Sequence, residues 1–267
     1  MGVIMKKVIF FDIDGTLIDC FGGIVDITPK VKEVIRAVQK NGDYVFIATG
    51  RPYALLSQNL LDFGFDGFIL SNGAHVIINN ETIYSETIDK KFISILENEL
   101  EKNNIQYILQ GELYSYLKDK FDDFYAYYDK IGVSRKYLKG NYTLDEVEAH
   151  KVEMLCPDDK SMDICISLVK SNPECDYFSS INKRAVELYL KKNTKATAIL
   201  KTIEYLNIPI ENTYAFGDGK NDIEMLSVVG CGIAMGNASD EVKKYAKQVT
   251  DSVQNDGVAI GIEKYVI

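Results

Sequence analysis

The sequence has few histidines and cysteines and no long apolar run. Two histidines among 267 residues leave little scope for a metal site built on imidazole. The five cysteines are scattered, odd in number and never form a C-x-x-C pair, so neither a disulfide framework nor a zinc site is expected. No apolar stretch approaches the roughly 20 residues that span a bilayer, and Asp12 and Asp14 interrupt the apolar start before it could act as a signal peptide. We therefore predict a cytoplasmic protein with no membrane partner.

An excess of positive charge is also lacking. Lys and Arg number 30 against 39 Asp and Glu, for a net charge of −9. Because sequence-independent affinity for nucleic acid comes mainly from Lys and Arg, no nucleic-acid partner is expected. What is present is ordinary for a globular protein: 46% hydrophobic and 26% charged residues are enough to bury a full core and to exclude whole-chain disorder. The length suggests one large domain or two modest ones.

The first 83 residues alternate between strand and helix signals. The expected elements are a strand at 7–11, a helix that Thr28 caps and Pro29 opens, a strand at 44–48, a helix opened by Pro52 and carrying four leucines up to position 61, and a strand at 68–70. This order predicts a Rossmann-like parallel sheet with helices on both faces.

The pattern changes after about residue 83 and returns near residue 191. The segment 84–190 predicts an inserted α+β domain, with strands at 105–109, 114–117, 151–155, 177–180 and 185–190 and helices at 92–100, 120–131 and 162–169. The α/β rhythm then resumes with a helix capped by Thr194, strands at 214–216, 232–235 and 248–250, and a helix at 222–228. We therefore predict a core domain from 1–83 and 191–267, and a cap domain from 84–190.

Polar clusters follow the expected core strands. DIDGT, TGR and SNGA come directly after the strands at 7–11, 44–48 and 68–70. Ligands of parallel sheets bind beyond the carboxyl ends of the strands, so these loops should converge on one crevice.

The aspartates of these loops indicate a cation site. Asp12 and Asp14 stand two apart at a strand end, which places both side chains on the same side. Asp218 follows a later strand, and Asp222 lies one helical turn beyond it. Crowded carboxylates repel one another, and oxygen ligands without histidine favour a hard cation such as Mg²⁺ over zinc. Any one aspartate alone is equally well a turn residue or a helix N-cap, but the repetition at strand ends favours a site.

Other residues of these loops suit an anion. Thr49 and Gly50 precede the helix that Pro52 is expected to open, so their hydroxyl and backbone N–H groups would form an anion site, although Thr49 could also be a plain N-cap. Lys195 occupies the first turn of its helix, the unfavourable end for a cation, which suggests a nearby anion rather than a solvated surface lysine. Together these parts suit phosphoryl transfer: one carboxylate attacks phosphorus, cations and amides neutralise its oxygens, and a second carboxylate acts as acid and base.

The combination of motifs resembles the haloacid dehalogenase (HAD) superfamily. The matching segments are FFDIDGTL, ATGR, SNGA, the lysine at 195 and FGDGKNDIEML. The size and place of the insertion, with GIAMGNAS and NDGVA near the end of the chain, resemble the Cof-type phosphatases with a C2B cap. By position, the resemblance implies that Asp12 is the nucleophile and a metal ligand, and that Asp14 is the general acid/base and binds the metal through its carbonyl. It implies Asp218 as the third metal ligand and Asp222 as a supporting residue. Thr49 and Lys195 would bind the phosphate, with Asn221 near it.

The expected function is that of a HAD-type phosphomonoester hydrolase (EC 3.1.3.-) with Mg²⁺ as cofactor and a cap that closes over its substrate. Small phosphorylated metabolites are the expected substrates, with sugar phosphates first and pyridoxal phosphate or flavin mononucleotide second. A phosphomutase remains an alternative, and so does a catalytically idle phosphate sensor, although a sensor has no need of an acid at Asp14.

Several further residues are candidates for substrate contact. Arg51 and Asn72 stand in strand-end loops. His75 follows SNGA and could face the crevice, although a strand or loop residue on the rim is favoured. The loop 182–184 is either a charged hairpin or a contact to the leaving group. The aromatic residues between 121 and 128, spaced by three and four, predict a helix face in the cap core rather than a substrate platform.

Overall fold

The computed structural model describes residues 6–130, 133–180 and 184–267. The chain divides into two compact units. The first unit consists of Met1–Gly50, Gln58–Tyr84 and Thr194–Ile267, and the second of Arg51–Ser57 and Ser85–Asn193. The short segment Arg51–Ser57, predicted as part of the core domain, thus groups with the second unit.

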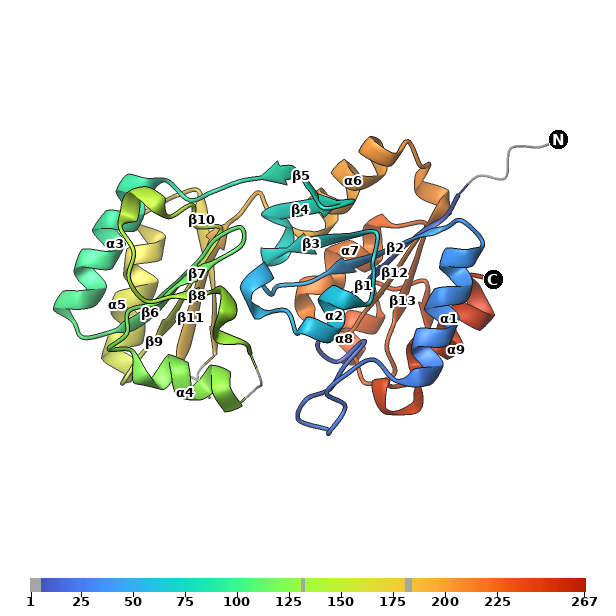
Figure 1. Cartoon of the computed structure of the whole chain (residues 1–267), viewed down its shortest axis with the longest axis horizontal. Helices are drawn as coiled ribbons and strands as arrows, with labels where there is room; N and C mark the ends of the chain where they lie inside the picture. Colours follow the sequence, from blue (N-terminus) through green and yellow to red (C-terminus); the bar gives the residue numbers. More distant parts are fainter. Residues whose placement is uncertain (1–5, 131–132, 181–183) are drawn as a thin grey trace. The chain divides into compact units, whose positions relative to one another are not determined.

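The first unit is built on an eight-stranded sheet with the order β14-β13-β12-β1-β2-β3-β4-β5 (Figure 1). Its strands are β1 (Val8–Phe11), β2 (Tyr44–Ala48), β3 (Gly67–Leu70), β4 (His75–Ile78), β5 (Glu81–Ser85), β12 (Thr213–Gly217), β13 (Cys231–Ala234) and β14 (Gln248–Val249). The six strands from β14 to β3 are parallel, and β4 pairs with β3 antiparallel. The predicted parallel-sheet α/β core is therefore confirmed.

Helices cover both faces of this sheet. They are α1 (Pro29–Lys40), α2 (Gln58–Asp62), α6 (Lys195–Leu206), α7 (Ile223–Val228), α8 (Asp240–Lys243) and α9 (Gly257–Tyr265). Helix α1 packs with α9, and α6 packs with α7. Alternate strand residues face different layers: Phe10 belongs to the cluster that includes α6 and α7, whereas Phe11 stacks on Phe216, whose ring lies against Gly261 of α9.

Local signals account for the start of two long helices. Thr28 caps α1 by accepting a hydrogen bond from the backbone N–H of Val31, with Pro29 at the first helical position. Thr194 caps α6, and Thr197 completes the reciprocal capping box. Both helix starts agree with the sequence prediction.

The helix expected from Pro52 to position 61 is absent from the structure. A 3-10 turn (Tyr53–Leu55) follows Pro52, Leu56 is extended, and α2 begins only at Gln58. The reason is that the leucines serve two cores. Leu55 is buried in the core of the second unit, whereas Leu60 is buried in the first unit.

The second unit has a six-stranded sheet with the order β10-β11-β9-β6-β7-β8. Its elements are α3 (Lys90–Lys102), β6 (Gln106–Gln110), β7 (Ser115–Tyr116), α4 (Asp122–Lys130), β8 (Leu138–Lys139), β9 (Lys151–Leu155), α5 (Asp159–Lys170), β10 (Cys175–Ser180) and β11 (Ala185–Leu190). All neighbouring strands are antiparallel except β7 and β8.

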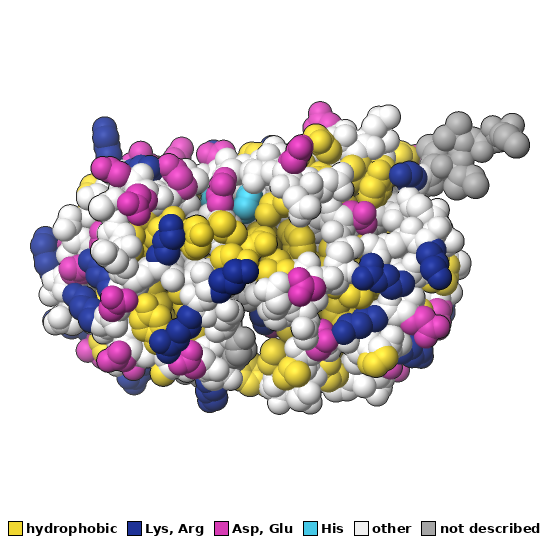
Figure 2. All heavy atoms as spheres, viewed as in Figure 1, with side chains coloured by type: hydrophobic (Ala, Val, Ile, Leu, Met, Phe, Trp, Pro, Cys, Tyr) yellow, Lys and Arg dark blue, Asp and Glu magenta, His cyan; other side chains and the backbone are white. Residues whose placement is uncertain are grey.

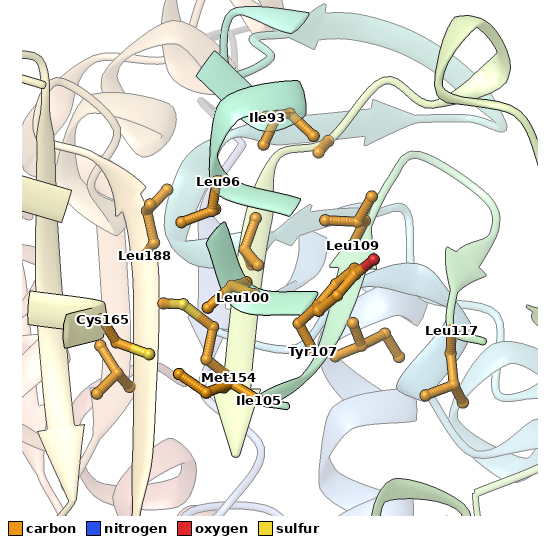
Figure 3. Close-up of a cluster of buried hydrophobic side chains, with 14 of the residues drawn as sticks. Ile93, Leu96, Leu100, Ile105, Tyr107, Leu109, Leu117, Met154, Cys165 and Leu188 are labelled. Carbon is orange, nitrogen blue, oxygen red and sulfur yellow. The ribbon is translucent and has the colours of Figure 1, made fainter. Parts of the chain in front are cut away.

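The core of the second unit is formed by side chains of its sheet and its helices. Figure 3 shows Leu96 and Leu100 of α3 beside Tyr107 and Leu109 of β6. Phe121, Phe124 and Tyr128 are buried in the same cluster, so the prediction that the aromatic run forms part of the cap core is confirmed.

Some elements have no counterpart in the sequence analysis. The hairpin of β4 and β5 turns through Asn79 and Asn80, both with positive φ, and α9 closes the chain. Short 3-10 turns complete the described chain at Ser71–Gly73, Arg135–Tyr137, Leu144–Glu146, Ile210–Asn212, Lys220–Asp222 and Val253–Asn255. Among the described residues, no helix combines the length and apolarity needed to cross a bilayer. Figure 2 shows Lys and Arg side chains interspersed with Asp and Glu over the visible face.

Candidate active site

The candidate site lies at the carboxyl ends of two adjacent parallel strands, β1 and β12. From β1 the chain continues outward through β2 and β3, and from β12 it continues through β13 and β14 in the opposite direction. This is the topological switch point at which parallel sheets bind ligands. Asp12 follows β1, Asp218 follows β12, and the backbone N–H of Asp12 donates to the carbonyl of Phe216 at 3.0 Å. The sheet therefore brings together two aspartates that are 206 positions apart.

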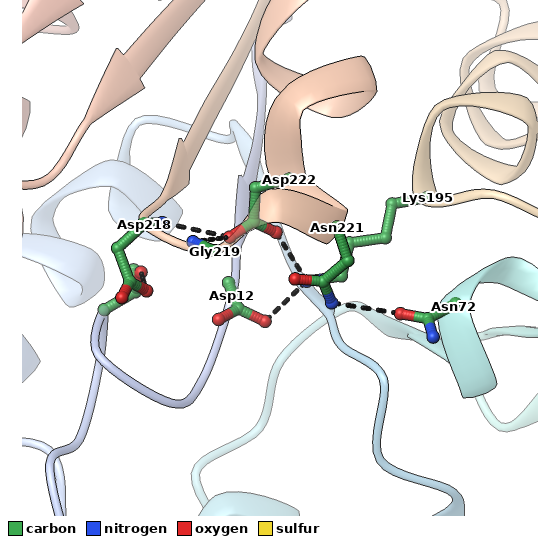
Figure 4. A network of polar contacts seen from close by, with 8 residues as sticks. Asp12, Asn72, Lys195, Asp218, Gly219, Asn221 and Asp222 are labelled. Carbon is green, nitrogen blue, oxygen red and sulfur yellow. Dashed lines mark hydrogen bonds and ion pairs between the residues drawn. The ribbon is translucent and has the colours of Figure 1, made fainter. Parts of the chain in front are cut away.

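Lys195 forms the centre of the site. Its Nζ lies 2.6 Å from Oδ1 of Asp12 and 2.6 Å from Oδ1 of Asp222, and all three side chains are buried (Figure 4). Burial by itself lowers the pKa of the Lys195 ammonium, but the two carboxylates outweigh it and raise the pKa above its usual value. Lys195 is therefore a fixed positive charge at the bottom of the site.

Asp222 organises the loop that follows β12. Its Oδ2 accepts hydrogen bonds from the backbone N–H groups of Asp218 at 2.9 Å and Gly219 at 2.8 Å. A Cβ on Gly217 would lie only 2.6 Å from the carboxyl carbon of Asp222, so a side chain at position 217 would displace it. With Oδ1 on Lys195 and Oδ2 on the loop, both oxygens of Asp222 are already bonded.

Asp218 lies directly against the turn that follows Asp12. Thr16 donates its hydroxyl to Oδ1 of Asp218 at 3.1 Å. Gly15 has a φ of +84°, and a Cβ there would come within 2.2 Å of Oδ2 of Asp218. Glycine at position 15 thus supplies both the left-handed backbone and the space that the carboxylate occupies.

Three carboxylates form a cluster that fits a hard cation. Oxygen atoms of Asp12, Asp218 and Asp222 all lie within 4.8 Å of one another. Burial first, and then the Asp222 charge, raises the pKa of Asp12 well above its ordinary range and that of Asp218 to about 6. A divalent cation would relieve this crowding, and an all-oxygen donor set suits Mg²⁺.

Because both oxygens of Asp222 are already bonded, Asp12 and Asp218 are the carboxylates best placed to hold a Mg²⁺ ion. The Asp14 side chain is exposed and lies outside this cluster.

A second group of residues borders the site from β2 and β3. Thr49 is buried at the end of β2, and its carbonyl accepts from the backbone N–H of Asn72 at 3.0 Å. Asn72 has a left-handed backbone with φ of 55°, and its Oδ1 accepts from Nδ2 of Asn221 at 3.1 Å. A Cβ on Gly50 would lie 3.0 Å from the same Oδ1, so the structure brings Gly50, Asn72 and Asn221 together. Thr49 and Gly50 do not precede the α-helix that was expected after them, because a 3-10 turn follows Pro52 instead.

The remaining candidates differ in where they lie. Arg51 groups with the second unit and donates to the carbonyl of Leu55 at 3.2 Å. His75 lies in β4, as a strand residue, but it is buried, with Nε2 3.0 Å from the Thr82 hydroxyl, so the expected exposure on the rim is wrong. In the loop 182–184, Arg184 donates to the carbonyl of Pro157 at 2.6 Å, whereas residues 182 and 183 lie outside the described residues.

Two residues at the site were not singled out from the sequence. Thr16 bonds Asp218, and Asn237 donates through Nδ2 to the Gly15 carbonyl at 2.9 Å and to Oδ2 of Asp218 at 3.3 Å. The available signals were the DIDGT and GNAS motifs, but residue spacing alone does not indicate that Asn237 returns to a turn 222 positions earlier.

The chain is similar in sequence and fold to known hydrolases. A family profile described as haloacid dehalogenase-like hydrolase matches residues 9–262. YkrA of Bacillus subtilis, named as a phosphatase, is 32% identical over 265 residues and the alignment covers 97% of both chains. The 5-amino-6-(5-phospho-D-ribitylamino)uracil phosphatase YcsE of Bacillus subtilis is 29% identical over 98% of this chain and 96% of its own. Among solved structures, the HAD subclass IIB sugar phosphatase BT4131 has a TM-score of 0.80 and 28% identity, over 97% of this chain and 99% of that chain.

Proposed function

Because the chain belongs to the haloacid dehalogenase-like hydrolase family and is a phosphomonoester hydrolase of that family, we propose that it releases phosphate from small metabolites in a Mg²⁺-dependent reaction through an aspartyl-phosphate at Asp12. The observation that carries the proposal is the buried Lys195 ammonium between Asp12 and Asp222, with Asp218 alongside. A buried cation that contacts a carboxylate at a strand end suits a site for a phosphate dianion.

Asp12 is the proposed nucleophile. Its carboxylate attacks phosphorus, the bond to the leaving-group oxygen breaks, and the phosphoryl group is transferred to Asp12. Lys195 holds one oxygen of Asp12 at 2.6 Å, which orients the carboxylate and offsets its repulsion from the incoming phosphate. Asp222 acts indirectly: it holds Lys195 on one side and the loop that carries Asp218 on the other.

The carboxylates of Asp12 and Asp218 and the backbone carbonyl of Asp14 are the proposed holders of Mg²⁺. When bound, the ion supplies Lewis-acid stabilisation of charge on the transferring phosphoryl group. Thr49, Gly50, Lys195 and Asn221 are the proposed phosphate binders, through a hydroxyl, a backbone N–H, an ammonium and a side-chain amide. Asn72 holds the Asn221 amide at 3.1 Å and borders Gly50, so it is the proposed positioning partner of this group.

Asp14 is the proposed general acid and base. Its side chain is exposed, unlike that of Asp12, so it is accessible to the leaving-group oxygen and to water. As an acid it protonates the departing alkoxide, and as a base it then takes a proton from the water that attacks the aspartyl-phosphate. Phosphate is released and Asp12 is regenerated.

Sugar phosphates are the first proposed substrates. The similarity to a sugar phosphatase of subclass IIB supports this order. Phosphorylated cofactors such as pyridoxal phosphate and flavin mononucleotide come second, joined by 5-amino-6-(5-phospho-D-ribitylamino)uracil because of the relative named for it.

The test is phosphate release from a panel that contains these compounds and nucleotides, with Mg²⁺ and then with EDTA. Wild type is compared with Asp12→Asn and with Asp62→Asn, a matched variant that neutralises an exposed aspartate on α2. We expect Mg²⁺-dependent release by wild type and Asp62→Asn, and none by Asp12→Asn. Conversion of a sugar phosphate to an isomer without free phosphate would instead identify a mutase, and binding without turnover in folded wild type would identify a sensor.

A further inference from the structure

Asn237 connects three parts of the first unit that are remote in the sequence. It lies in the turn after β13, within the GNAS motif. Its Nδ2 donates to the carbonyl of Gly15 at 2.9 Å and to Oδ2 of Asp218 at 3.3 Å, and its Oδ1 accepts from the backbone N–H of Val253 at 2.9 Å. Both ends of the side-chain amide are therefore in use.

The turn at Gly15 and the carboxylate of Asp218 are held together by two donors. Thr16 donates to Oδ1 of Asp218, and Asn237 donates to Oδ2. Of these two side chains, only Asn237 also bonds the backbone of the turn, at the carbonyl of Gly15, which belongs to the peptide between Gly15 and Thr16. Its loss would leave Asp218 bonded to Thr16 but would release the Gly15 carbonyl.

Asn237 is in turn fixed by the segment that precedes α9. Besides the bond from Val253, the backbone N–H of Gly236 donates to the carbonyl of Asp251 at 2.9 Å. The same segment holds the loop after Asp14 from another side, because the side-chain amide of Gln254 donates to Asp19. This arrangement connects the GNAS motif to residues 251–254, directly before the NDGVA motif, and the proposed reaction has no direct use for these contacts.

We propose that Asn237 is a positioning residue of the cation site: it sets the Asp14–Gly15 turn against Asp218, so that the Asp14 carbonyl and the Asp218 carboxylate face one Mg²⁺ ion. This inference rests on the proposed function. Mg²⁺ demands near-ideal octahedral geometry, so a small displacement of the turn costs affinity. Partners that orient metal ligands typically contribute about 10–100-fold to metal affinity.

The chemistry of the side chain explains why an amide is needed at position 237. Its NH₂ group meets two acceptors, a carbonyl and a carboxylate, which only a donor can bridge. Asn237→Asp keeps an acceptor for Val253 but replaces the donor with a negative charge beside Asp218. The aspartate variant should therefore be more impaired than Asn237→Ala.

The experiment measures Mg²⁺ binding to the full chain by isothermal titration calorimetry, which requires no turnover. The proteins are wild type, Asn237→Ala, Asn237→Asp and the control Asn255→Ala. Asn255 lies in the same segment before α9, and its side-chain amide donates to Asp251 at 3.0 Å rather than to Gly15 or Asp218. We expect the Kd for Mg²⁺ to rise about 10-fold or more in Asn237→Ala, further in Asn237→Asp, and less than about twofold in Asn255→Ala.

The Mg²⁺ dependence of turnover supplies a second readout. In Asn237→Ala, the Mg²⁺ concentration for half-maximal activity should rise, while kcat at saturating Mg²⁺ should largely recover. A Kd within twofold of wild type in both Asn237 variants would overturn the inference, as would a loss of thermal stability with unchanged Mg²⁺ binding. Absence of Mg²⁺ binding to folded wild type would instead refute the proposed function itself, so the two failures are distinguishable.

Discussion

Lys195 and Asp222, 27 positions apart in the sequence, form a 2.6 Å ion pair in which both side chains are completely buried. A buried charge is costly unless it is paired and hydrogen-bonded, so neither residue is tolerated alone in this position. Asp12 is the second carboxylate on the same ammonium. The ion pair that stabilises the core therefore also contacts, through Lys195, the residue proposed to attack phosphorus.

Lys195→Met should destabilise the fold as well as abolish phosphate release. Removing the ammonium leaves two buried carboxylates without their partner, a change that typically costs about 3–5 kcal/mol. Lys192→Met is the matched control, because Lys192 pairs with Glu86 at 2.8 Å but is 60% exposed, and exposed pairs contribute less than about 1 kcal/mol. Urea unfolding in EDTA compares the variants. Equal free energies of unfolding for both would refute the role given to the buried pair.

Asp14→Asn should lose turnover without losing Mg²⁺. The variant keeps the backbone carbonyl but lacks the acid, so kcat for a sugar phosphate should fall by about 10²–10⁴-fold. With p-nitrophenyl phosphate, the rate of phosphoryl transfer to Asp12 should fall less than with a sugar phosphate, because the p-nitrophenolate leaving group needs no proton. Since water activation is also impaired, phosphorylated enzyme should accumulate, which intact-protein mass spectrometry detects as one added phosphoryl group. Unphosphorylated protein and wild-type turnover would both contradict the assignment.

Gly15→Ala should remove Mg²⁺ binding by displacing Asp218. Gly42→Ala is the control, since Gly42 has nearly the same φ, +85° against +84°, but has open space where a Cβ would be added. Both variants carry the left-handed backbone penalty of about 1–2 kcal/mol. Only Gly15→Ala also places a Cβ 2.2 Å from an oxygen of Asp218. Calorimetric titration should show normal Mg²⁺ affinity in Gly42→Ala alone; equal affinity in both would disprove the steric argument.

Glu101→Gln should change the acid stability of the second unit. A hydrogen bond from Lys118 is the main cause that lowers the pKa of Glu101 below its usual value. The folded carboxyl therefore binds a proton less readily than the unfolded one, so it stabilises the fold above about pH 4.5 and loses that effect as pH falls through the lowered pKa.

The size of this pH effect should be small. Glu101 and Lys118 are each about a third exposed, and Lys118 retains Glu97 at 3.6 Å when Glu101 is changed. Melting temperatures from pH 3 to 7 should show wild type more stable than Glu101→Gln at pH 7 and equal to it near pH 3. Glu112→Gln, at an exposed position, is the control. A constant difference across the range would rule out this ion pair as the cause.

Much of the core fold was predictable because its signals are local. The apolar run before Asp12 is a buried strand, Thr28 and Pro29 open a helix, and Thr194 caps the helix that carries Lys195. Each of these depends on neighbours within a few residues, where capping, proline geometry and strand burial act.

Other features were not predictable because they depend on contacts between distant segments. The leucines after Pro52 have the spacing of a single helix, yet Leu55 and Leu60 are buried in different units. His75 directly follows the SNGA motif and was expected on the rim, yet it is buried in β4, with Nε2 3.0 Å from the Thr82 hydroxyl of β5. Neither outcome can be derived from local periodicity, because it depends on which core covers the side chain.

Local sequence patterns specify the α/β class, the strand ends that carry the aspartates, and the residue types available for phosphoryl transfer. How those residues combine depends on the folded chain. It placed Lys195 between Asp12 and Asp222, engaged both oxygens of Asp222, and brought Asn237 to the Gly15 turn. The physical reason is that strand and helix formation follow short-range propensity and periodicity, whereas hydrogen bonds between remote loops depend on sheet order and on the glycines that let those loops approach.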